Sequence, residues 1–177
     1  MSTLFVAVIV IILIITISLL VILLNINSKN KNNKKSSDDY TSQTLVVSNI
    51  ILPKKISQID YFSLSKASKQ VFESFKALDY TNKPASKLDK IEWHTWQVSL
   101  LMAILKEEKG FFVPNDDSLF HETILNTNKN SIVQSTQKII DKYNNSIDVN
   151  KSRDELSQDI FWSSREVSIL FYYMSKY

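Results

Sequence analysis

The sequence contains no cysteine and a single glycine, Gly110, among its 177 residues. The absence of cysteine excludes disulfides, thiolate-bound metals, iron–sulfur clusters and thiol catalysis. Phosphate-binding and dinucleotide-binding loops need several glycines where the backbone approaches the ligand, so these motifs are excluded as well. With only three prolines, the composition favours helices over a turn-rich β fold.

Motifs for catalysis and metal binding are also missing. The two histidines, His94 and His121, do not stand in an H-E-x-x-H or any other metal-ligand spacing. Asp116 and Asp117 are adjacent acids ahead of a helical stretch, a position typical of helix caps. No G-x-S-x-G or other nucleophile motif occurs in the sequence. We therefore expect no enzymatic activity, no cofactor, no metal and no catalytic residue.

The basic excess of the chain lies entirely before Tyr61. From Tyr61 to Tyr177, thirteen lysines and two arginines face fifteen acidic residues, so this part is neutral and the net charge of +3 comes from the preceding segment. Domains that bind nucleic acid concentrate basic residues on the folded part of the chain. We therefore expect no nucleic-acid partner.

A long apolar run stands near the N-terminus. Residues 4–24, LFVAVIVIILIITISLLVILL, carry no charge and are long enough to cross a hydrocarbon core of about 30 Å as a helix. The alternative is a cleaved signal peptide, which has a basic start, a shorter apolar core and a cleavage site of small residues. The sequence lacks these features and predicts a transmembrane helix, with residues 1–3 as a short extracytoplasmic N-terminus.

Four lysines directly after the apolar run predict its orientation: Lys29, Lys31, Lys34 and Lys35. No lysine or arginine precedes the run, and positively charged flanks stay in the cytoplasm. We expect a single-pass protein of the cell (inner or plasma) membrane, with its N-terminus outside and its C-terminal domain in the cytoplasm. The same lysines also suit the anionic headgroups of the lipid bilayer.

The rest of the chain divides into a linker and a helical domain. Residues 25–60 are predicted to be a flexible juxtamembrane linker, whose apolar segment 45–52 docks on the domain as an extended stretch. Residues 61–177 have helical periodicity near 64–78, 84–110, 116–125, 131–143 and 152–177. We expect an all-α fold, in which one transmembrane helix is followed by a small bundle of about five helices. No repeat with a period of 20–50 residues stands out.

Two of the predicted helices are apolar on two faces. One runs from Pro84–Ser86 to Gly110, and the other opens at a capping box of Ser152 and Glu155. Because Trp and Tyr dominate interface hot spots, the second faces predict a partner-binding surface. Its candidate residues are Trp93, Trp96, Leu100, Ile104, Trp162, Ile169 and Tyr173. The alternative is that this small domain uses both faces of each helix in its core.

These features predict a membrane-anchored, non-enzymatic interaction protein with one or more protein partners. We expect an accessory, assembly or chaperone-like subunit of a larger membrane complex, such as an export, motility or envelope machine. One alternative is an enzyme or ligand-binding domain with a pocket near His94, Trp93 and Trp96. A second alternative is an exported helical domain behind an atypical signal peptide.

Overall fold

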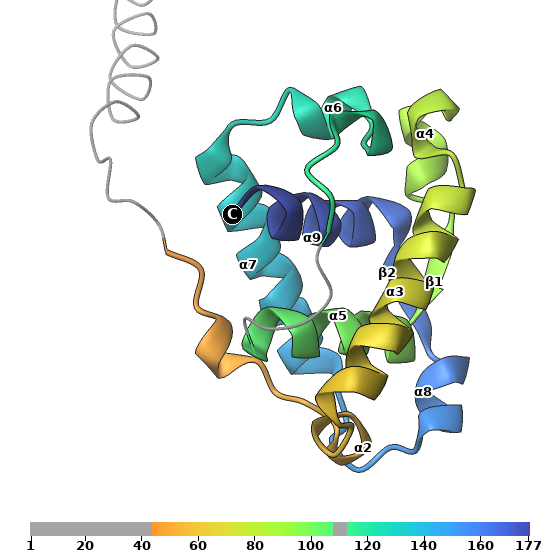
Figure 1. Cartoon of the computed structure of the whole chain (residues 1–177), viewed down its shortest axis with the longest axis vertical. Coiled ribbons are helices and arrows are strands. Elements are labelled where there is room, and N and C mark those ends of the chain that lie inside the picture. The colour runs from red at the N-terminus through yellow and green to blue at the C-terminus, as the bar shows by residue number, and fades with distance from the viewer. Residues whose placement is uncertain (1–43, 108–112) are drawn as a thin grey trace, which may run out of the picture. The chain divides into compact units, whose positions relative to one another are not determined.

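The computed structural model describes residues 44–107 and 113–177, which are mostly helical, as the sequence predicts (Figure 1). The predicted transmembrane helix at 4–24 and the lysines from Lys29 to Lys35 lie outside the described residues. Among the helices that are described, none is long and apolar enough to cross a membrane.

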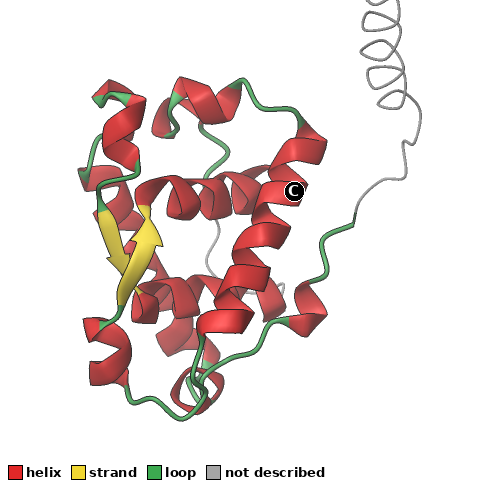
Figure 2. Cartoon of the chain, turned by 180° about the vertical axis from the view of Figure 1, so that it is seen from behind, coloured by secondary structure: helices red, strands yellow, loops and turns green. Residues whose placement is uncertain are grey.

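Long helices form the body of the domain: α3 (Tyr61–Ala77), α5 (Thr95–Glu107), α7 (Lys129–Ser146) and α9 (Ser164–Lys176). Shorter helices and 3-10 turns connect them: η1 (Val47–Asn49), α2 (Lys54–Ser57), η2 (Tyr80–Asn82), α4 (Ala85–Leu88), η3 (Asp117–Leu119), α6 (Glu122–Leu125) and α8 (Arg153–Gln158). Two short strands, β1 (Glu92–His94) and β2 (Ile160–Ser163), pair in antiparallel orientation and lie side by side in Figure 2.

The two strands correct the expectation of uninterrupted helices. The stretch predicted as one helix from 84 to 110 contains α4, then β1, then α5, and the stretch from 152 onward contains α8, β2 and α9. Each strand is short and contains a tryptophan, Trp93 or Trp162, and the two tryptophans face each other across the pair. Cross-strand contact of this kind stabilises a strand, and it comes from a partner far away in the sequence.

Helix α5 is the most deeply buried helix of the described residues. All its side chains from Val98 to Leu105 are buried. Helices α3 and α7 each begin after a residue whose side chain caps the helix: Asp60 accepts a hydrogen bond from the backbone of Ser63 at 3.0 Å, and Asn128 accepts one from Ser131 at 2.9 Å. Leu45 and Ile50, in the apolar segment ahead of α2, are also buried in the core.

The domain consists of two halves that have the same order of elements. Helices α2, α3 and α4 recur as α6, α7 and α8 at one constant sequence offset, and α5 recurs as α9 at an offset that is one position longer. The first residues of these pairs are Lys54 and Glu122, Tyr61 and Lys129, Ala85 and Arg153, and Thr95 and Ser164. Strand β2 stands between α8 and α9 as β1 stands between α4 and α5. We call residues equivalent when these offsets relate them.

The arrangement of the two halves in space follows a two-fold axis. Figure 1 shows α2 and α8 at one end of the domain and α4 and α6 at the other. We infer an approximate two-fold axis from this exchange, because such an axis would carry α2 onto α6 and α4 onto α8. We call it the pseudo-two-fold axis, since the two halves differ in most of their residues.

The sequences of the two halves agree at the two strands and at the helices that follow them. The pattern I-x-W-x-x-x-x-V-S-x-L occurs at 91–101 and again at 160–170. Leu88 and Leu156, which lie in the short helices before the strands, both have a relative exposure of 0%. The two copies stand farther apart in the sequence than successive solenoid repeats do, so a search for periods of 20–50 residues does not detect them.

The additional position of the second half lies between α8 and β2, because three residues separate Leu156 from Ile160 whereas two separate Leu88 from Ile91. Trp93 pairs with Trp162 and Glu92 with Ser163, but His94 pairs with Ile160. Strand β2 therefore has an additional residue opposite the same stretch of β1 backbone. This bulge is separate from the change of offset, because Ile160 and Trp162 have the same spacing as Ile91 and Trp93.

Candidate interaction site

Hydrogen bonds across the pseudo-two-fold axis join the two halves. The indole nitrogen of Trp93 donates to Ser164 Oγ at 2.8 Å, and that of Trp162 donates to Thr95 Oγ1 at 3.1 Å. Each of these hydroxyls donates in turn to a backbone carbonyl at 3.1 Å. Because buried indole nitrogens need an acceptor, these tryptophans have a structural role at the centre of the domain.

Two buried tyrosines add a second pair of links. The hydroxyl of Tyr80 lies 3.0 Å from Ser164 Oγ, and that of Tyr143 lies 3.0 Å from Ser99 Oγ. Burial raises the pKa of Tyr80 to about 12 and also raises the pKa of Tyr143, because the phenolate loses its hydration. Both hydroxyls therefore stay protonated in the folded domain well above the usual pKa of tyrosine.

The structure divides the predicted partner-binding residues into two groups. The members with a relative exposure of 6% or less belong to the core: Trp93, Leu100, Ile104 and Trp162. The members that stay partly exposed are Trp96, Ile169 and Tyr173. Core packing, the alternative interpretation of these faces, therefore applies to the first group. A partner-binding role stays a prediction for the second.

The histidines have separate positions. His121 is buried and caps α6, because its Nδ1 accepts a hydrogen bond from the backbone of Thr123 at 3.2 Å. His94 follows Trp93 on β1, and its Nδ1 is buried without a hydrogen-bond partner among the described residues. No group of acidic and histidine side chains that could hold a metal ion is found in the part of the chain that the structure describes.

An open groove of about 580 Å³ lies between α3 and α8 and includes the edge of Trp96. We call it the α3–α8 groove. Helix α3 contributes one polar face at spacings of three and four residues, and its opposite face is buried in the core. The residues that line the groove are Lys55, Ile59, Ser63, Lys66, Ala67, Gln70, Trp96, Ser152, Arg153 and Asp154.

Three exposed cations surround this groove: Lys55 on α2, Lys66 on α3 and Arg153 on α8. The guanidinium carbon of Arg153 lies 5.3 Å from the centroid of a Trp96 ring, a cation–π contact. Within residues 44–107 and 113–177, none of the three forms a salt bridge. Asp154 is the single acidic residue of the lining, so the α3–α8 groove is positively charged.

The equivalent positions in the other half of the domain carry no such charges. Thr123 is equivalent to Lys55, Gln134 to Lys66 and Ala85 to Arg153. Both halves form the same α-helices and strands. The fold therefore does not require these three cations.

The residue equivalent to Trp96 is also different. It is Arg165, whose Nε donates to Asp89 Oδ1 at 2.8 Å while its Nη2 donates to the carbonyl of Ala85 at 3.3 Å. Arg165 thus satisfies its charge within the domain. At the α3–α8 groove, the cation Arg153 instead lies against an aromatic ring.

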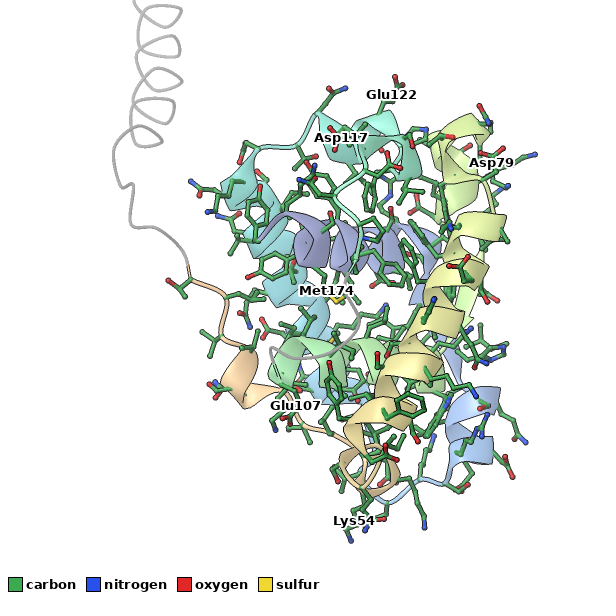
Figure 3. All side chains as sticks on the ribbon, viewed as in Figure 1. Lys54, Asp79, Glu107, Asp117, Glu122 and Met174 are labelled. Carbon is green, nitrogen blue, oxygen red and sulfur yellow. The ribbon has the colours of Figure 1, made fainter. Side chains whose placement is uncertain are left out.

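Charged side chains of both signs lie at the two ends of the domain. Figure 3 shows Lys54 at the end formed by α2 and α8, whereas Asp79, Asp117 and Glu122 lie at the opposite end. Asp117 there forms an ion pair with Lys176 at 2.6 Å. Asp117 is thus paired within the domain, whereas the described residues form no ion pair with the cations of the α3–α8 groove.

The sequence did not single out Lys55, Lys66 or Arg153, because they come from three separate elements and share no spacing. The internal repeat was the available signal, since it aligns these cations with uncharged residues of the other half. The α3–α8 groove combines cations with an aromatic surface, which is a chemistry of binding rather than of bond breaking. Searches of known protein families, of curated proteins and of solved structures find no match to this chain.

Proposed function

We propose that this chain is a membrane-anchored, non-enzymatic interaction protein whose helical domain lies in the cytoplasm. The anchor is the apolar run at residues 4–24, and the lysines at 29–35 keep the domain on the cytoplasmic side. The protein acts as an accessory, assembly or chaperone-like subunit of a larger membrane complex. Tethering raises the effective concentration of the domain near partners in the same membrane, which favours this role.

The observation that carries the proposal is the α3–α8 groove with its three cations and its aromatic edge. Beside it, Phe62 has a relative exposure of 76%. Phe62 precedes Ser63 and lies one helical turn before Lys66, so it borders the face of α3 that lines the groove. Aromatic and arginine side chains are enriched at protein interfaces, and a bulky exposed aromatic residue beside a groove supports a binding role.

Site-specific photo-crosslinking of the full-length chain in its native membrane tests the proposal. A photoreactive amino acid replaces Phe62 or Lys66, which border the groove, and in the matched control it replaces the exposed Glu122 at the opposite end. We expect one discrete protein adduct from both groove positions and none from position 122. Adducts of equal yield from all three positions, or only lipid adducts, would contradict the proposed function.

A further inference from the structure

We propose that the α3–α8 groove binds a short acidic segment of a partner protein, in which an apolar side chain stands between carboxylates. This inference rests on the proposed function, because it names the partner chemistry of the same site. It combines the charge of the groove, its apolar surface, its length and the comparison with the other half of the domain.

The groove carries an excess of positive charge. Lys55, Lys66 and Arg153 approach it from three different elements, and Asp154 is the single acid of the lining. Among the described residues, none of the three cations has a carboxylate within salt-bridge distance. Carboxylates from a partner would form charge-assisted hydrogen bonds with them and accelerate encounter through complementary potential.

The groove also offers a place for an apolar side chain. Ile59, Ala67 and Trp96 line it, and all three are half-buried. Arg153 lies over a Trp96 ring at 5.3 Å, so its guanidinium group stands at the border between the apolar and the charged surface. An apolar side chain flanked by carboxylates would contact both surfaces at once.

The dimensions of the groove suit a short extended segment. Its α3 lining runs from Ser63 to Gln70, which corresponds to about 10 Å along the helix axis. About three to four residues of an extended chain span this distance. The apolar residues line a concave surface, which a peptide enters more readily than a flat bilayer does.

The other half of the domain forms the same helices without these three cations. Thr123, Gln134 and Ala85 occupy the equivalent positions, and the same helices form around them. Like charges that converge on one groove repel one another and weaken the fold slightly. Their presence at one end only therefore indicates a ligand that offsets this repulsion.

Binding of a defined peptide to the full-length chain in nanodiscs of neutral phosphatidylcholine tests the inference. The probe is a fluorescent peptide with the core Glu-Glu-Leu-Glu-Glu, and its anisotropy reports binding. We expect salt-sensitive binding that falls at least about tenfold in Lys66→Glu and in Arg153→Glu. The matched control Lys138→Glu makes the same charge change on α7 of the other half, and we expect it to bind as the unmodified chain does.

Several outcomes would overturn the inference. Equal binding of a Gln-Gln-Leu-Gln-Gln peptide would exclude recognition of carboxylates, and equal losses in all three variants would reduce the effect to net charge. Lys66-dependent binding to phosphatidylserine vesicles without peptide binding would assign the groove to lipid. Lys66-dependent crosslinks between two copies of the chain, again without peptide binding, would assign it to a second copy of the chain.

Failure of this inference can be distinguished from failure of the proposed function. If the peptide does not bind while position 62 still crosslinks to one discrete protein, the partner uses another chemistry and the interaction role stands. If neither experiment gives a signal, both the partner chemistry and the interaction role are wrong. Circular dichroism of Lys66→Glu and Arg153→Glu shows whether the domain keeps its helices. Because both residues are exposed, we expect both variants to keep the helical content of the unmodified chain.

Discussion

At the scale of single residues, the centre of the domain depends on buried polar side chains that bond in pairs. Ser164 Oγ accepts from both Trp93 and Tyr80 and donates to a backbone carbonyl, so all its hydrogen-bonding capacity is used. Each such bond contributes about 1 kcal/mol net, but a group left buried without a partner costs more. The defined arrangement of these buried side chains therefore depends on every hydrogen-bonding group having a partner.

The raised pKa of Tyr80 predicts how stability depends on pH. The unfolded chain releases the tyrosine proton near pH 10, whereas the folded domain holds it to about pH 12. Because the folded state binds more protons in this window, the free energy of unfolding falls as the pH rises from about 10 to 12. Tyr80 accounts for about 2 to 3 kcal/mol of this fall.

Urea unfolding of residues 44–177 at pH 8 and at pH 11.5 measures the effect. We expect Tyr80→Phe to lose less stability between the two pH values than the unmodified domain, although it is less stable at pH 8. The exposed Tyr177 serves as the control, and Tyr177→Phe should keep the original pH dependence. An unchanged pH dependence in Tyr80→Phe would show that Tyr80 ionises normally in the folded domain.

At the scale of elements, α3 and α7 occupy equivalent positions and differ at one buried site. Tyr143 on α7 bonds to Ser99 Oγ of α5, and its equivalent on α3 is Phe75. The serine equivalent to Ser99 is Ser168 on α9, and its Oγ is buried without a partner among the described residues. The position equivalent to Tyr143 thus carries no hydroxyl that could bond to Ser168 Oγ.

A substitution taken from the other half should therefore stabilise the domain. We expect Phe75→Tyr to place a hydroxyl near Ser168 Oγ and to raise the free energy of unfolding by about 1 kcal/mol. The reciprocal change Tyr143→Phe should lower it by about 1 to 2 kcal/mol, because it removes the bond to Ser99. Thermal and urea unfolding measure both, and a destabilised Phe75→Tyr domain would mean that the two sites are not equivalent.

The sequence allowed a part of these elements to be predicted. Helices near 64–78 and 131–143 were expected, and α3 and α7 confirm them because the apolar period of each helix lies within its own sequence. The strands could not be predicted, since β1 is stable only against β2, which lies in the other half of the sequence. Trp93 and Trp96 also fit a helical spacing, which concealed the change from strand to helix between them.

The candidate site was less predictable than the fold. Trp96 was selected for its aromatic surface, and the structure leaves it half-buried beside Arg153. The cations that surround it form one positively charged surface only when α2, α3 and α8 pack close together. Their charges can be read from the sequence, but their proximity cannot. The packing of the two halves depends on contacts between residues that lie far apart along the chain.

At the scale of the whole molecule, each half supplies hydrogen-bond partners and one strand to the other half. Bonds from Trp93, Trp162 and Tyr143 all reach into the opposite half. The strand pair also contains one strand from each half. A separate half would therefore expose an unpaired strand and a large part of its apolar surface to water.

Separation of the halves tests this dependence. We expect fragments 44–107 and 113–177 to be unfolded alone and to regain helical circular dichroism when they are mixed in equal amounts. The continuous domain 44–177 is the reference. A cooperative thermal transition in either fragment alone would show that a half is an independent folding unit.

The pseudo-two-fold axis also has a consequence for biosynthesis. The ribosome completes α5, the most buried helix of the described residues, before any part of β2 or α9 exists. While the ribosome translates the second half, the apolar surface of the first half has no surface to pack against. This interval, set by the distance along the chain between equivalent elements, is when the nascent chain is most exposed to aggregation and most dependent on holding factors.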